Sequence, residues 1–276
     1  MNKQTCPICP HHCCLEPGQT GLCRARGNVG GQIEAVNYGL ITSMALDPIE
    51  KKPLYHFHPG SMIFSIGSFG CNLRCPFCQN WAISTPGKDE VDWREFAPEE
   101  VVDLALQLRN RGNIGIAYTY NEPLVGYEFV YDCAVLARKQ GLYNVLVSNG
   151  CCCREPLERL LPLIDAVNFD LKAFTGQFYR KIGGDLETVK QAIALAAETT
   201  HVEVTTLIIP GENDSEAEIR VLAQWLAGVR RDIPLHLTRF FPQYKYRDRC
   251  ATDVHVLRKL AETAREELDY VYLGNC

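Results

Sequence analysis

The chain has 276 residues, of which 46% are hydrophobic and 14 are cysteines, and its formal net charge is −5. This length suits one barrel-sized domain, alone or with a small appendage. No apolar run approaches the eighteen or so residues of a membrane helix, and the acidic balance does not favour non-specific nucleic-acid binding. The first residues lack the apolar stretch of a signal peptide, and many cysteines without one indicate a reducing interior. We therefore expect a cytoplasmic protein with no membrane or nucleic-acid partner.

The N-terminal segment carries four cysteines in the order C-x2-C-x3-C-x9-C. Prolines and glycines among them exclude a helix and favour a knuckle (residues 6–23) held by its ligands rather than by a core. Four thiols at such spacings predict a second metal centre, either zinc or an iron–sulfur cluster. His11 or His12 is an alternative ligand, and Cys14 is interpreted as a spare thiol. The four predicted ligands are Cys6, Cys9, Cys13 and Cys23.

Residues 32–42 alternate loosely and predict a short strand or hairpin. Residues 47–60 contain three prolines and little periodicity, so they are interpreted as an ordered connector. His56 and His58 lie in this connector and either face the predicted metal site or serve structure alone. We predict a cysteine-rich metal-binding segment with its connector over residues 1–60 and a core over residues 61–276.

The apolar run 61–67 predicts a strand that leads into three further cysteines at C-x3-C-x2-C spacing, Cys71, Cys75 and Cys78. We call residues 71–80 the cysteine loop; the aromatic Phe77 directly precedes its third cysteine. Three thiolates that converge on one metal centre leave one coordination position open for a small molecule. The alternative is a zinc-binding loop with a distant fourth ligand.

Strand and helix patterns alternate after residue 61. Strands are predicted at 61–67, 114–120, 144–148, 166–172, 202–209, 235–238 and 270–273, and helices at 98–108, 124–140, 154–161, 186–199, 216–228 and 253–268. Strands separated by helices require a parallel sheet with right-handed crossovers. The pattern therefore predicts an α/β fold with six strand–helix units.

Polar side chains follow the ends of these predicted strands. Because functional residues gather at the carboxyl ends of strands in parallel α/β barrels, we expect these side chains to form the site. A carboxylate such as Glu122 can pair with the ammonium group of a bound amino acid, and Lys172 with its carboxylate. Taken singly, each is also typical of a helix cap or a surface ion pair. The residues are Asn121, Glu122, Asn149, Asp170, Lys172 and Arg239.

Two further stretches leave alternatives open. Cys151, Cys152 and Cys153 would lie near the barrel mouth, either as redox or substrate-linking thiols or as small buried residues. Residues 244–249 mix basic and aromatic side chains, and we interpret them as a solvated rim loop rather than an RNA-binding surface.

The cysteine loop, including its aromatic Phe77, resembles the signature of the radical S-adenosylmethionine (radical SAM) superfamily. The resemblance implies that the three loop cysteines hold a [4Fe-4S] cluster whose fourth iron binds the amino and carboxylate groups of S-adenosylmethionine. It also implies that the α/β units form a partial six-unit (β/α) barrel. In this setting Phe77 and the polar strand-end residues become candidates for binding the cofactors.

Several of these residues resemble motifs of the activating enzymes of glycyl-radical enzymes, a branch of the superfamily. Asp170-Leu171-Lys172 and Asn149-Gly150 are intact, and Tyr120-Asn121-Glu122 stands where that branch has a Gly-Gly-Glu that contacts the amino group of S-adenosylmethionine. Val147-Ser148 replaces an Asp-Thr that contributes to a monovalent-cation site in pyruvate formate-lyase activating enzyme, which argues against that site here.

The connector and the strings at 118–123, 203–207 and 272–275 are similar to the AmmeMemoRadiSam group of radical SAM proteins. The same similarity suggests that a longer tail follows Cys276. Activity expected from the resemblance is reductive cleavage of S-adenosylmethionine to a 5′-deoxyadenosyl radical that abstracts hydrogen from a substrate, with a flavodoxin or ferredoxin as electron donor. The substrate is either a glycine of a partner protein or a small molecule or protein side chain. An alternative of another class is a metal-stabilised binding or electron-transfer module without chemistry.

Overall fold

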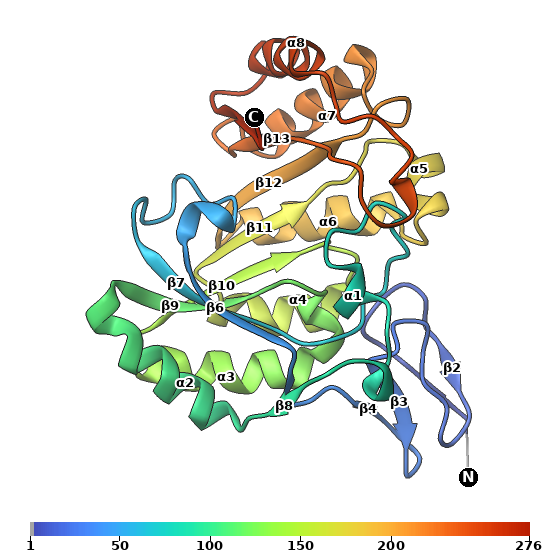
Figure 1. The fold of residues 1–276 in the computed structure, drawn as a ribbon, viewed down its shortest axis with the longest axis vertical. Helices are drawn as coiled ribbons and strands as arrows, with labels where there is room; N and C mark the ends of the chain where they lie inside the picture. Colours follow the sequence, from blue (N-terminus) through green and yellow to red (C-terminus); the bar gives the residue numbers. More distant parts are fainter. Residues whose placement is uncertain (1–2) are drawn as a thin grey trace.

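The computed structural model describes residues 3–276, which are built around one eight-stranded sheet with the strand order β14-β13-β12-β11-β10-β9-β7-β6 (Figure 1). Seven strands are parallel neighbours, and only β6 is antiparallel. The bounds are β6 Ser43–Pro48, β7 Met62–Gly67, β9 Asn113–Tyr118, β10 Tyr143–Ser148, β11 Ala166–Asp170, β12 His201–Ile208, β13 Leu235–Arg239 and β14 Val271–Gly274. The parallel α/β prediction is confirmed, with six strand–helix units between β7 and β14.

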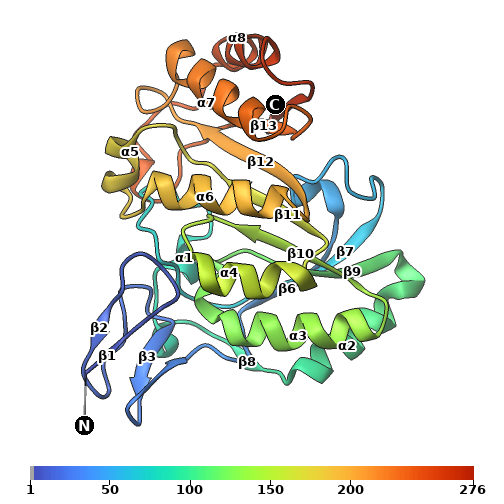
Figure 2. The ribbon, with the colours of Figure 1, turned by 180° about the vertical axis from the view of Figure 1, so that it is seen from behind.

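Helices cover one face of this sheet, as the view from behind shows (Figure 2). They are α2 Pro98–Gln107, α3 Tyr127–Lys139, α4 Arg154–Leu160, α6 Leu186–Ala197, α7 Glu216–Val229 and α8 Val254–Arg265, whereas the short α1 Trp81–Ser84 and α5 Gly176–Lys181 lie at the carboxyl ends of the strands (Figure 1). Asp185, Ser215 and Asp253 cap α6, α7 and α8 through their side-chain oxygens, which fixes where these helices begin. No helix in residues 3–276 is long and apolar enough to cross a membrane.

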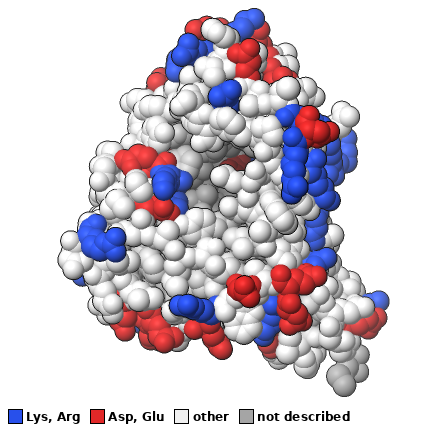
Figure 3. All heavy atoms as spheres, in the orientation of Figure 1, with Lys and Arg blue, Asp and Glu red and all other residues white. Residues whose placement is uncertain are grey.

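The sheet separates two apolar cores. Residues such as Ile116 and Tyr118 of β9 pack toward the helices, whereas Ala117 between them packs on the inner face with Ile63 and Val145. The inner face is left open by the helices, and Figure 3 shows a hollow in the middle of the corresponding surface with an acidic group inside it.

The connector closes the inner face at the amino ends of the strands. Leu54 packs in the inner core, and the Asn168 side chain on β11 donates to the carbonyl of Pro53 (2.8 Å). Residues 43–48 overlap the first residues of the connector. They form the edge strand β6, which pairs with β7 along its whole length. The core sheet thus begins before residue 61, because an antiparallel neighbour completes the edge hydrogen bonds of β7.

The N-terminal segment forms short antiparallel pairs beside the carboxyl ends of β7 and β9 (Figures 1 and 2). These are β1 Gln4–Thr5 with β2 Cys14–Leu15, β3 Arg26–Val29 with β4 Gln32–Ala35, and β5 Leu40–Ile41 with β8 Arg94–Glu95. The predicted strand or hairpin at 32–42 corresponds to β4 and β5.

Candidate functional site

The cysteine loop follows β7 at the carboxyl end of the sheet and is anchored by Asn121. The Asn121 Oδ1 accepts from the backbone amide of Ser68 (2.9 Å), and its Nδ2 donates to the carbonyls of Phe69 and Gly70 (3.1 Å each). Because this buried amide is already used by the backbone, its role in the structure is to fix the entry to the loop.

The three loop cysteines lie half-buried in a site that disfavours free thiolates. Burial raises the pKa of Cys75 to about 12 and raises the pKa of Cys71 and Cys78 above their ordinary value. The Cys71 sulfur accepts from the Leu73 amide (3.4 Å) and from Asn149 Nδ2 (3.7 Å). Soft sulfur donors that receive N–H hydrogen bonds fit an iron–sulfur cluster, whose iron would hold them as thiolates.

Lys172 brings a positive charge to this set of thiols. Its Nζ pairs with Asp170 Oδ2 (2.9 Å) and acts electrostatically on Cys75 and Cys78, where it lowers the thiol pKa against the effect of burial. Burial alone lowers the pKa of Lys172, but Asp170 and Cys75 outweigh this and raise it. Lys172 is therefore a fixed ammonium at the end of β11 beside the cysteine loop.

Glu122 and Asn149 join the ends of β9 and β10. Burial raises the pKa of the Glu122 carboxyl to about 7, although hydrogen bonds oppose this effect. Glu122 Oε1 accepts from the Leu124 amide (3.0 Å) and Ser148 Oγ (2.8 Å), and Oε2 accepts from the Asn149 amide (2.8 Å). Asn149 Nδ2 in turn donates to Asn72 Oδ1 (2.9 Å), which links this strand end to the cysteine loop.

Phe77 and Arg239 lie farther from the thiols. Phe77 is 6% exposed and packs between the rings of Phe178 and Tyr246, each 6.0 Å away between centroids. Arg239 Nε donates to the Thr252 carbonyl (2.7 Å) at the end of β13. Both lie at the carboxyl end of the sheet, and within residues 3–276 neither makes a hydrogen bond to the three cysteines.

The stretch 244–249 forms a lid over part of the cysteine loop instead of a free rim loop. The Lys245 amide donates to the Pro76 carbonyl (2.9 Å), and the ring of Tyr244 stacks on Trp81 at 5.2 Å. The aromatic rings of Tyr244 and Tyr246 therefore take part in packing within the chain.

The four knuckle cysteines are close enough to interact electrostatically. Cys9 interacts with Cys6 and Cys23, and Cys23 also interacts with Cys13, while Cys14 is exposed. No three His, Cys, Asp or Glu side chains in residues 3–276 are placed to hold a single metal ion. This finding applies to the knuckle and to the cysteine loop alike. The cysteines that hold a four-iron cluster lie farther apart than the ligands of a single metal ion. The second metal centre stays a prediction.

His56 and His58 do not face the cysteine loop, because the connector lies at the opposite, amino end of the strands. The His56 amide donates to Glu203 Oε1 (2.7 Å), and the His56 ring contacts the Tyr272 hydroxyl (2.7 Å). His236, 2% exposed, lies inside the sheet and binds the other oxygen of Glu203 at 2.6 Å.

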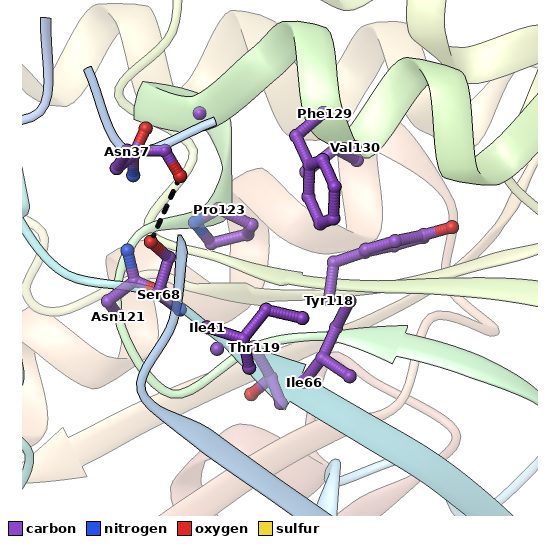
Figure 4. A pocket seen from close by; sticks show the side chains of 12 residues that line it. Asn37, Ile41, Ile66, Ser68, Tyr118, Thr119, Asn121, Pro123, Phe129 and Val130 are labelled. Atoms are coloured by element: carbon purple, nitrogen blue, oxygen red, sulfur yellow. Dashed lines mark hydrogen bonds between the residues drawn. The ribbon is translucent and has the colours of Figure 1, made fainter. Parts of the chain in front are cut away.

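A separate small pocket lies between the ends of β7 and β9 and helix α3 (Figure 4). Ile66, Tyr118 and Phe129 line it, and Ser68 Oγ donates to the Asn37 carbonyl (3.5 Å) across it. Ile66, Tyr118 and Phe129 belong to the helix-facing core, and none of the three loop cysteines lines this pocket.

Two residues that sequence patterns did not single out complete the site. Asn72 connects the loop to Asn149 and donates through Nδ2 to the Cys151 carbonyl (2.6 Å). Arg74 donates to the carbonyls of Cys71 (3.0 Å) and Leu22. Both lie between the cysteines, but nothing in their spacing indicated which partners they would reach. Cys151 and Cys152 are almost fully buried, and Cys153 is half-buried.

The family model of the radical SAM superfamily matches residues 65–223. An uncharacterized protein of Methanocaldococcus jannaschii is 44% identical over 278 residues, covering 99% of this chain and 82% of that protein. The pyruvate formate-lyase-activating enzyme of Clostridium pasteurianum is 26% identical over 219 residues, covering 72% of this chain and 89% of the enzyme.

Solved structures share the fold at low sequence identity. A radical SAM methyltransferase from Sphaerobacter thermophilus has a TM-score of 0.59 and 17% identity, over 79% of this chain and 67% of that one. Streptococcus suis SuiB bound to S-adenosylmethionine has a TM-score of 0.58 and 14% identity, over 78% and 52%. Since the family model spans more than half of the sequence, from β7 into α7, this chain belongs to the radical SAM superfamily.

Proposed function

We propose that this chain cleaves S-adenosylmethionine reductively at a [4Fe-4S] cluster held by Cys71, Cys75 and Cys78. When bound, the cluster and S-adenosylmethionine supply a 5′-deoxyadenosyl radical, and the protein supplies position and exclusion of water. The observation that carries this proposal is the convergence of the three thiols with Asn149 and the Asp170–Lys172 pair at one end of the sheet.

Different side chains around the thiols suit the carboxylate and the ammonium group of an amino acid-like ligand. Lys172 supplies an ammonium that suits the carboxylate of S-adenosylmethionine, and Asp170 keeps it in place. Glu122 suits the ligand's ammonium group, although its two oxygens already accept three protein hydrogen bonds. We assign Glu122 to holding the Asn149 backbone, with any contact to the ligand's ammonium group as an additional role.

We further propose that the substrate is a glycine in a partner protein, as for activating enzymes of glycyl-radical enzymes. Similarity to the pyruvate formate-lyase-activating enzyme over 72% of the chain supports this proposal. A low-potential donor of the flavodoxin or ferredoxin type would supply the electron, because reduction of a sulfonium needs a potential near the low end of the iron–sulfur range.

A small substrate is the second candidate, and one feature of the inner face favours it. Lys52 Nζ, almost fully buried, pairs with Asp47 Oδ2 (2.8 Å), which also accepts from the Tyr120 hydroxyl (2.7 Å). Asp47 lies in β6 opposite Ile63 of the inner core, and Lys52 lies in the connector, so this ion pair is on the inner side of the sheet. A few buried polar groups of this kind are typical of sites that hold a polar ligand.

Anaerobic incubation with S-adenosylmethionine and a strong reductant tests the proposed reaction. We expect 5′-deoxyadenosine from the reconstituted wild type and none from a Cys71→Ala/Cys75→Ala/Cys78→Ala variant. Failure of the iron-loaded wild type to make 5′-deoxyadenosine would refute the proposal. Deuterium transfer from a glycine-labelled partner into 5′-deoxyadenosine would support the protein substrate, whereas transfer from a labelled small molecule would support the second candidate.

A further inference from the structure

Three of the four knuckle cysteines are buried although they lie in a segment with little regular structure. Cys6, Cys9 and Cys23 are 5%, 8% and 7% exposed. Cysteine is often buried as a small apolar residue, but four cysteines at this spacing are also the donor set of a zinc or iron–sulfur site.

A buried arginine beside these thiols favours the metal site. Arg26 is 3% exposed, and its two terminal nitrogens bind the Glu128 carboxylate at 2.7 Å each. Its Nε is buried without a hydrogen-bond partner in residues 3–276, and the guanidinium lies close enough to Cys6 to interact with it electrostatically. A buried N–H without a partner is energetically unfavourable. A thiolate or a bridging sulfide at the knuckle would supply the missing acceptor.

The knuckle is docked on the cysteine loop through backbone contacts. His11 Nε2 lies 2.9 Å from the Asn72 carbonyl, and Arg74 joins the carbonyls of Leu22 and Cys71. Gly70, directly before Cys71, has a φ of +86°, and a Cβ there would lie 2.5 Å from the Cys23 carbonyl oxygen. The two sets of cysteines are thus held against each other at fixed distance.

Hydrogen bonds lead from the knuckle to the cysteine loop. His11, which lies between Cys9 and Cys13, has its Nε2 2.9 Å from the Asn72 carbonyl, and the Asn72 Oδ1 accepts from Asn149 Nδ2 at 2.9 Å. The same Asn149 nitrogen lies 3.7 Å from the Cys71 sulfur. His11, Asn72 and Asn149 therefore connect the knuckle to a cysteine-loop thiol.

We propose that Cys6, Cys9, Cys13 and Cys23 bind a second iron–sulfur cluster and that it relays electrons to the Cys71 site past Asn72 and Asn149. The role as a relay rests on the proposed function, whereas the cluster itself does not. One electron leaves a reduced flavodoxin- or ferredoxin-class donor, reduces the knuckle centre and moves on to the cysteine-loop centre; no covalent bond or proton is exchanged. Zinc, which has no redox chemistry, would make this hydrogen-bonded connection useless for electron transfer.

Metal analysis of a variant without the cysteine-loop ligands tests the site. The Cys71→Ala/Cys75→Ala/Cys78→Ala protein is reconstituted anaerobically with iron and sulfide, and iron, sulfide and zinc are counted. We expect about four irons and four sulfides per chain, as for a four-cysteine cluster, and an electron paramagnetic resonance signal after reduction. Zinc alone, or no metal, would overturn the proposal whether or not the wild type cleaves S-adenosylmethionine.

A second variant tests the relay without removing the cysteine loop. Cys9→Ser/Cys23→Ser should keep about four irons and the resonance signal of the remaining cluster. We expect reduction of that cluster by flavodoxin, followed by stopped-flow absorbance, to slow at least tenfold, while the exposed control Cys14→Ser keeps the wild-type rate. An unchanged rate in the double variant would overturn the relay. If the double variant loses all iron, the Asn72→Leu variant is tested in its place, and the rate of cluster reduction by flavodoxin is again the measurement.

Discussion

Glu203 offers a sharp test of how the connector is held at the amino end of the barrel. This fully buried carboxylate accepts four hydrogen bonds: from the His56 amide and His201 at Oε1, and from the Tyr55 amide and His236 at Oε2. We predict that Glu203→Gln destabilises the protein, because the new NH2 group must face two of these donors. The connector is the segment that then loses its anchor.

Two independent considerations give the same magnitude. Burial alone raises the pKa of Glu203, but the four donors outweigh it and lower the pKa from 4.5 to about 2. That difference corresponds to about 3 kcal/mol in favour of the folded carboxylate. Loss of two bonds to a charged acceptor, at about 1.5–3 kcal/mol each, also gives at least 3 kcal/mol. The contribution is fully present above pH 4.5 and is lost as the pH falls toward 2.

Urea unfolding of the anaerobic holoprotein at pH 7 measures the effect. With a slope of roughly 3 kcal/mol per molar, the midpoint should fall by about 1 M. Hydrogen exchange at the amides of Tyr55 and His56 should accelerate as well. Glu198→Gln is the matched control, because this exposed carboxylate makes no side-chain hydrogen bond that the structure records in residues 3–276. A midpoint for Glu203→Gln equal to that of the control would refute the reasoning.

Three further predictions concern the carboxyl end. Gly70→Ala should lower the iron content and the urea midpoint far more than Gly60→Ala. Both glycines have a positive φ, but only at Gly70 do backbone atoms lie within 4 Å of the added Cβ. Equal losses would mean that the backbone strain of a positive φ is the whole effect. Lys172→Met should weaken S-adenosylmethionine binding by about tenfold to a hundredfold, the worth of one charge-assisted hydrogen bond, and unchanged calorimetric affinity would contradict this role. Glu122→Gln should cost about 1–3 kcal/mol in urea, because its amide would face donors such as the Asn149 N–H; an unchanged midpoint would contradict the bonding described.

The order of strands and helices could be predicted because each element carries its own period and end signals. Helix α7, for example, follows Ser215, which caps it, and the strand before it is rich in β-branched residues. Strand β6 was missed because Ser43–Pro48 mixes exposed and buried positions and ends in proline, as edge strands do. Its partner β7 lies on the far side of the connector, a pairing that no local pattern records.

Strand ends indicated where the candidate site would lie, but not which contacts its residues make. Asp170 and Lys172 were both expected at the end of one strand, and in the structure they form an ion pair. The side-chain amide of Asn121, by contrast, makes hydrogen bonds to the backbone of residues 68–70. These partners lie about fifty residues earlier in the chain, so no local pattern indicates them. The histidines of the connector show the same limit, since whether they face the carboxyl or the amino end of the sheet depends on the path of the chain.

The junction between the knuckle and the cysteine loop suggests how metal and fold depend on each other. Several of its contacts are directed at backbone groups, such as the carbonyls of Leu22 and Asn72, while Cys6 and Ile8 pack into the main core and Cys23 and Ala25 form a small cluster with Val125. Such hydrogen bonds define position well but contribute only about 1 kcal/mol each. Thiolate–metal bonds contribute far more where a segment lacks a core of its own. The hydrogen bonds therefore set where the knuckle lies, and the metal that we propose there would supply most of the energy that keeps it folded.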